Sequence, residues 1–182
     1  MTAMAQIGTL TSEIRLVRLL EYWEGKRAGR EMPRRSDIDP IEIPAILPIL
    51  YLTEVGHEPF RVRFRLVGTE VVRLTGRDVT GRHVDESLYG ENAAEILGFF
   101  RAACEHRRPV LVQGHAYWLH QKEWMRVTSL HLPLGSEGAH VGMVLCGFAA
   151  EPHVRQAQPP LNENFDFRAY KIHVLGDGSG LG

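Results

Sequence analysis

Residues 59–86 read PFRVRFRLVGTEVVRLTGRDVTGRHVDE, and the periodicity of this stretch changes at Gly68. Before that glycine, apolar and charged side chains alternate strictly: the apolar set is Phe60, Val62, Phe64 and Leu66, and the charged set is Arg61, Arg63 and Arg65. Alternate residues of a β-strand point to opposite faces, so this pattern predicts a half-buried strand with one apolar and one guanidinium face. After Gly68, glycines and small polar residues divide the chain into short helical segments.

The rest of the sequence predicts four more strands and two longer helices. The strands are expected at 49–55, 110–119, 123–134 and 140–149, and the helices at 12–25 and 91–106. The last three strands are separated only by short polar segments, which predict hairpins. On the long helix, the apolar stripe is expected at Ala94, Leu97, Phe100, Ala103 and Cys104. These elements together predict an α+β fold with a five-stranded antiparallel sheet and helices over one face.

The N-terminal segment predicts a helix whose apolar stripe must pack against a sheet or another helix. Leu16, Leu19, Leu20 and Trp23 form one apolar stripe at helical spacing, whereas Ile14 and Val17 lie off it. Further along, Asp39 is placed to cap a short helix that begins at Pro40, and prolines 44 and 48 prevent its continuation. Residues 37–48 are therefore expected to form a clip that holds the N-terminal helix to the core.

Several short motifs resemble one bacterial family. These are Tyr22-Trp23, Lys26-Arg27, Gly29-Arg30, Pro33, residues 37–40, residues 42–44 and Leu47-Pro48, followed by Gly68-Thr69 and the pattern Gly76-x-Asp78-x-Thr80-Gly81. Over residues 20–148 the chain resembles the small single-domain PAS proteins of the PAS_5 type. The resemblance implies strand order 2-1-5-4-3, an N-terminal helical extension and a sensory or regulatory role in bacterial signalling. It implies no established ligand, cofactor or reaction, so the cofactor stays unknown.

We expect three regions: an N-terminal helix and clip (1–47), a PAS-like core (48–150), and a linker with a C-terminal tail (151–182). Aromatic and β-branched residues between 165 and 174 predict a short added element that packs back or binds a partner. No apolar run is long enough for a membrane span, and two cysteines do not make a disulfide framework, so a cytoplasmic location is expected. The formal net charge of −1 gives no basic field for nucleic acid.

No group of residues predicts catalysis or a metal site. His115 and His120 are an odd number of residues apart and would point to opposite faces of a strand, so they cannot bind one metal together. His131, in mid-strand, is the first histidine to test as a ligand. Cys104 and Cys146 are expected to pack as small apolar groups.

The function predicted is a sensory module that binds a small molecule or a protein partner and acts by conformational change or dimerisation. Candidate pocket residues are Phe64, Leu66, Phe100, Trp118, Leu130 and His131. Candidate contacts with a homodimer or signalling-protein partner are Leu16, Leu20, Trp23, Arg61, Arg63 and Arg65. A small-molecule sensor predicts a cavity with one or two polar groups, a ligand-free adaptor predicts a filled core with an exposed patch, and an enzyme is a distant third.

Overall fold

The computed structural model describes residues 2–115, 125–136, 140–152 and 170–176. Six strands form one antiparallel sheet in the order β2-β1-β5-β4-β3-β6. Their bounds are β1 (Leu50–His57), β2 (Phe60–Val67), β3 (Val110–His115), β4 (Met125–Gly135), β5 (Val141–Pro152) and β6 (Lys171–Val174). The α+β class and the order 2-1-5-4-3 are confirmed, and a sixth strand is added beside β3.

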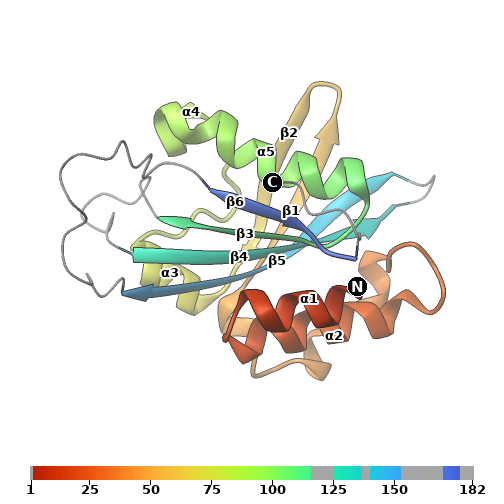
Figure 1. The fold of residues 1–182 in the computed structure, drawn as a ribbon. Helices are drawn as coiled ribbons and strands as arrows, with labels where there is room; N and C mark the ends of the chain where they lie inside the picture. The colour runs from red at the N-terminus through yellow and green to blue at the C-terminus, as the bar shows by residue number, and fades with distance from the viewer. Residues whose placement is uncertain (1, 116–124, 137–139, 153–169, 177–182) are drawn as a thin grey trace.

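Helices cover both faces of this sheet (Figure 1). The inner face lies under α5 (Ala93–His106), preceded by the short helices α3 (Thr69–Thr75) and α4 (Glu86–Tyr89). The outer face carries the expected N-terminal extension, which consists of α1 (Ala3–Leu10) and α2 (Ile14–Arg27). Four 3₁₀ turns join these elements, η1 (Arg35–Asp37), η2 (Pro40–Glu42), η3 (Leu47–Ile49) and η4 (Gly90–Asn92). None of the described helices is long and apolar enough to cross a membrane.

The predicted stripe of α2 is buried against the outer face of the sheet. Leu16, Leu19, Leu20 and Trp23 are each at most 1% exposed. The indole Nε1 of Trp23 donates a 3.0 Å hydrogen bond to the carbonyl oxygen of Pro133, which satisfies its polar atom inside the core. Contact is closest at Gly147 of β5, where an added Cβ would lie 2.6 Å from Leu16 Cδ2 and 2.8 Å from Leu19 Cδ2.

The segment 37–48 holds α2 through Tyr22. The Tyr22 hydroxyl donates to Glu42 at 2.7 Å and accepts from the backbone N–H of Asp39 at 2.8 Å. Lys26 on the next turn of α2 pairs with the same Glu42 carboxylate at 2.6 Å. Asp39 caps η2 by accepting from the Ile41 backbone. Through these contacts the segment joins α2 to the chain that leads into β1.

The alternation of buried and exposed side chains predicted for β2 ends after Phe64, so it does not include Arg65 and Leu66. Thr53 of β1 pairs with Phe64, but the preceding Leu52 pairs with Leu66, so Arg65 is an extra residue in a β-bulge. The bulge turns Leu66 to the outer face, where it is 50% exposed, and Val67 lines the inner face instead. The expectation that Leu66 shares the apolar face with Phe64 is therefore wrong, because strict alternation holds only where no residue is inserted.

The sixth strand lies within the region expected to be a linker and tail. β6 pairs with β3 from Val110–Val174 to Gln113–Lys171. Tyr170, just before it, donates a 2.6 Å hydrogen bond to the carbonyl oxygen of His115 and packs directly over Gly114. The added element predicted from its aromatic and β-branched residues thus packs back onto the sheet of its own chain.

On α5 the buried stripe is Ala93, Ile96, Phe99, Phe100 and Ala103. Ala94, which was expected on it, is exposed, and Leu97 is only partly buried. The helix turns its two larger neighbours, Ile96 and Phe99, toward the sheet because they bury more apolar area. Phe100 and Ala103 are common to the expected and the observed stripe.

Replacing Gly147 with alanine should destabilise the protein by about 1–3 kcal/mol, because a Cβ there forces α2 away from the sheet. Gly98→Ala on α5 is the matched control, since an added Cβ there meets nothing within 4 Å and alanine favours helix by up to ~1 kcal/mol. Urea unfolding of both variants measures the difference. Equal stability of the two variants would show that α2 is not held closely against β5.

Candidate functional site

A cavity of about 70 Å³ lies between the inner face of the sheet and α3, α4 and α5. Most of its surface is apolar, as is usual for a small-molecule site. For scale, an apolar cavity of about 150 Å³ can hold benzene, so this one has room for only a few non-hydrogen atoms. Its lining residues are Tyr51, Phe64, Val67, Val71, Thr75, Arg77, Val79, Tyr89, Ile96, Phe99, Phe100, Val112, Val127, Ser129, His131, Phe148 and Tyr170.

Tyr51 and Ser129 are a buried polar pair in this lining. Their hydroxyl oxygens are 2.8 Å apart, so each satisfies the other, and burial raises the pKa of the Tyr51 phenol well above its usual range. Tyr51 therefore stays protonated. The pair adds polarity to the wall without adding charge.

His131 is the most deeply buried titratable group of the lining, with 1% of its surface exposed. Burial lowers the pKa of its imidazole to about 3, so the ring is neutral at physiological pH. Its Nδ1 lies 3.6 Å from the Cys146 sulfur. The imidazole and the Phe100 ring pack in a T-shaped arrangement, with their centroids 4.9 Å apart. Its Nε2 is buried and has no hydrogen-bond partner among the described residues.

Arg77 brings a permanent charge to the same cavity. One guanidinium nitrogen donates to the Leu88 carbonyl oxygen at 3.0 Å, and the group lies over the Tyr89 ring, 5.2 Å from its centroid. Its other terminal nitrogen, Nη2, is buried and has no hydrogen-bond partner in the described part of the chain. A buried guanidinium nitrogen without a hydrogen-bond partner is costly in free energy.

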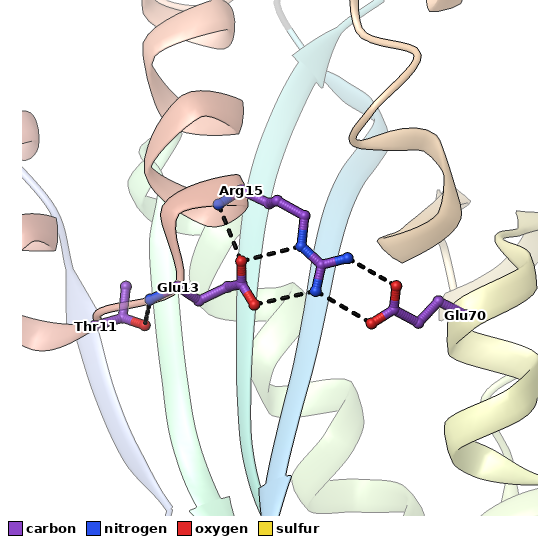
Figure 2. Close-up of polar contacts among 4 residues, drawn as sticks. All are labelled: Thr11, Glu13, Arg15 and Glu70. Carbon is purple, nitrogen blue, oxygen red and sulfur yellow. Dashed lines mark hydrogen bonds and ion pairs between the residues drawn. The ribbon is translucent and has the colours of Figure 1, made fainter.

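A charged cluster outside the cavity joins α2 to α3 (Figure 2). The Arg15 guanidinium lies between two carboxylates, donating to Glu13 at 3.0 and 3.1 Å and to Glu70 at 2.7 and 3.1 Å. The hydrogen bonds from Arg15 lower the pKa of both carboxyl groups and raise that of Arg15. Glu70 lies in the first turn of α3, whose Val71 and Thr75 line the cavity, so this cluster connects α2 to the cavity wall.

The six predicted pocket residues have four different outcomes. Phe64, Phe100 and His131 line the cavity. Leu130 is fully buried but pairs with Gly147, which faces Leu16 and Leu19, so it belongs to the outer face instead. Leu66 is exposed because of the bulge. Trp118 lies outside the described residues.

Sequence reasoning missed the polar residues of the lining other than His131. Arg77 was passed over although it stands inside the Gly76-x-Asp78-x-Thr80-Gly81 pattern, which was used only as a mark of the fold. The alternation of β4 carried a signal for Ser129, because it is two residues from His131 and so shares its face. Nothing in the sequence pattern indicated that Tyr51 and Tyr89 line the cavity.

The predicted partner contacts also separate. Leu16, Leu20 and Trp23 are buried by the chain's own sheet, so they are not on a surface that a partner can reach in this structure. Arg61, Arg63 and Arg65 are exposed along β2. Arg63 donates to the Gly81 carbonyl oxygen at 3.2 Å, and Arg65 lies 3.9 Å from the Glu54 carboxylate.

Among the described residues no group of three or more histidines, cysteines or carboxylates could hold a metal ion. The pKa of the Cys104 thiol is raised to about 12 by burial, and that of Cys146 is raised well above its usual range by the same cause. Both thiols are therefore protonated and weakly nucleophilic at neutral pH.

Glu70→Gln should cost about 0.5–1 kcal/mol at pH 7, because it weakens a partly exposed ion pair. The pKa of Glu70 is lowered in the folded state, so its stabilisation is present above the unfolded value of 4.5 and is lost as pH falls through the lowered folded value. The variant and wild type should therefore converge at acid pH. Denaturant unfolding across pH measures this, with the exposed Glu21→Gln on α2 as control; a constant difference at every pH would contradict the ion pair.

His131→Leu should flatten the pH dependence of stability between pH 6.5 and 5. The unfolded chain takes up a proton on this histidine in that window and the folded chain does not, since its folded pKa is about 3. Wild type should therefore lose up to ~1.4 kcal/mol per pH unit on acidification through this group alone. The exposed His83→Gln should leave the slope unchanged. A wild-type slope in the His131→Leu variant would mean that the imidazole is not held neutral.

Comparison with family models gives a match over residues 12–148, most of the chain, to the PAS_5 family, described as a PAS domain. Comparison with curated proteins finds no match. The matched range runs from the start of α2 to β5 and contains the residues of the cavity except Tyr170. Its sheet order and helical cover agree with the PAS fold. The chain belongs to the PAS_5 family of PAS domains, which makes it a sensory or regulatory module.

Proposed function

We propose that this PAS domain senses a small molecule that binds in the cavity between the sheet and α3–α5. The observation that carries this proposal is the presence of two buried polar atoms, Arg77 Nη2 and His131 Nε2, without partners among the described residues. Both side chains line the cavity. A core that serves packing alone has no use for unpaired donors or acceptors, because each one costs free energy. A ligand that bonds to them would remove this cost.

Occupancy of the cavity would be transmitted by α3. This helix has seven residues and buries only Val71 in the core, so little packing fixes its position. Its first turn holds Glu70, which binds Arg15 of α2 through two hydrogen bonds. A ligand that displaces α3 would therefore strain or release the ion cluster, and the N-terminal helices would change their contact with the outer face. Conformational change or dimerisation through these helices is the proposed output.

A ligand-free adaptor is the second candidate, and it is favoured by apolar side chains left on the surface. Leu66 is 50% exposed, Ile14 is 56% exposed and Ile41 is 85% exposed. Such side chains, together with the exposed arginines of β2, are suited to a protein surface of mixed character, a second copy of the chain included. This reading leaves the unpaired atoms of Arg77 and His131 without a role.

The test is native mass spectrometry of the chain purified from its own host, compared with a variant whose cavity is filled. Val112→Ile and Val127→Ile together add two methylene groups to the cavity wall, whereas Leu66→Ile on the exposed side of β2 is the control. Wild type and the control should carry an added mass that the filled variant lacks. The filled variant should also fail to restore the wild-type phenotype to a deletion strain.

A wild-type chain without added mass, together with full complementation by the filled variant, would reject the sensor and favour the adaptor. Circular dichroism of the three proteins shows whether the filled variant keeps the fold, because added methylenes in a packed core can themselves cost 1–3 kcal/mol, roughly.

A further inference from the structure

We infer that the ligand of this cavity is a short-chain carboxylate, whose charged end binds Arg77 and whose alkyl part fills the apolar remainder. The inference rests on the proposed function and adds the chemical class of the ligand. Arg77 is the residue that carries it, since guanidinium and carboxylate match in charge and in planar, two-pronged geometry.

The loop that follows α3 holds Arg77 in place. α3 ends at Gly76, whose φ of +77° is a left-handed conformation that favours glycine, and the chain turns there toward the cavity. Asp78 then binds both the backbone N–H and the hydroxyl of Thr80, at 2.9 and 2.7 Å. The carboxylate beside Arg77 in the sequence is thus engaged within its own turn. The Arg77 guanidinium is therefore held in position, and the Asp78 carboxylate does not pair with its charge.

The charge of Arg77 has no ionic partner in the described part of the chain. It is bonded to the neutral Leu88 carbonyl oxygen and lies over the Tyr89 ring, and its Nη2 is buried. Asp85, a carboxylate further along the chain, accepts from the Ser87 hydroxyl at 2.6 Å and from the Leu88 backbone at 3.2 Å. A guanidinium with a buried, unpaired nitrogen favours an anion as its partner, and the described residues supply none here.

The remainder of the cavity limits what that anion can be. Its wall is mainly valine, isoleucine and phenylalanine, so a fully hydrated anion such as phosphate would lose its water without compensation. Its volume of about 70 Å³ excludes long acyl chains and aromatic acids. His131 is neutral at physiological pH, so Nε2 offers a single uncharged donor or acceptor for a carbonyl or hydroxyl group on the ligand. A small carboxylate with an apolar or singly oxygenated tail satisfies these conditions.

The experiment titrates the full chain with propionate and with propionamide, which has the same shape and no charge. Binding is followed by the NMR methyl signals of Val112 and Val127, two lining residues on different strands. Propionate should shift both signals saturably, and propionamide should bind about tenfold or more weakly, because it lacks the charge-assisted hydrogen bonds. Arg77→Met should abolish the preference. Arg73→Met, which removes an exposed arginine from α3, the helix just before Arg77, should retain it.

Arg77→Lys is included in case the methionine variant does not fold. Lysine keeps the charge and loses the planar fork, so it should bind propionate more weakly than wild type and still more tightly than propionamide. Equal binding of propionate and propionamide, or binding of propionate unchanged by both Arg77 substitutions, would overturn the carboxylate class while leaving a cavity-binding sensor in place. Saturable shifts with inorganic phosphate but not propionate would overturn it equally. No saturable shift with propionate would also overturn it, and the mass measurement on host-purified protein would then decide the proposed function separately.

Discussion

Burial of the central β4–β5 pair on both faces is the constraint on which the rest of the molecule depends. From Ser129 to Leu134 every residue of β4 is buried, and every residue from Val144 to Ala149 of β5 is buried opposite them. A sheet with only one covered face would alternate buried and exposed residues along these strands. The N-terminal helices are therefore part of the folded core, because without α2 half of these side chains would face water.

Two-sided burial also explains where the cavity can form. The outer layer packs so closely that Gly147 leaves no room for a Cβ under Leu16 and Leu19. The inner layer is built differently, since α3 and α4 have seven and four residues and are joined by turns at Gly76 and Gly81. Short helices bury few side chains and cannot follow a sheet face without gaps. The irregular wall of the inner layer is thus both the origin of the cavity and the part of the structure best able to adjust to a ligand.

The sequence predicted the sheet well and the site only in part, and particular residues show why. Alternation in β2 and the hairpins of β3–β5 depend on local pattern, so strand order and the covering by α2 followed once the family resemblance was recognised. Leu66 was misplaced because a bulge depends on pairing between strands, which the sequence pattern does not show. Leu130 was misplaced although the alternation of β4 already puts it on the opposite face from His131. Arg77 was missed since only the folded chain shows that Nη2 is buried and unpaired.

The position of α3 connects these features. At its first turn Glu70 binds Arg15 of the N-terminal layer, and one residue beyond its C-terminal glycine Arg77 reaches the cavity. Seven helical residues span about 10 Å. An anion bound by Arg77 would act on one end of α3, while the ion cluster holds the other end to α2 (Figure 2). Binding of an anion in the cavity would thus change the contacts of helices on the opposite face of the sheet, without any rearrangement of the strands between them.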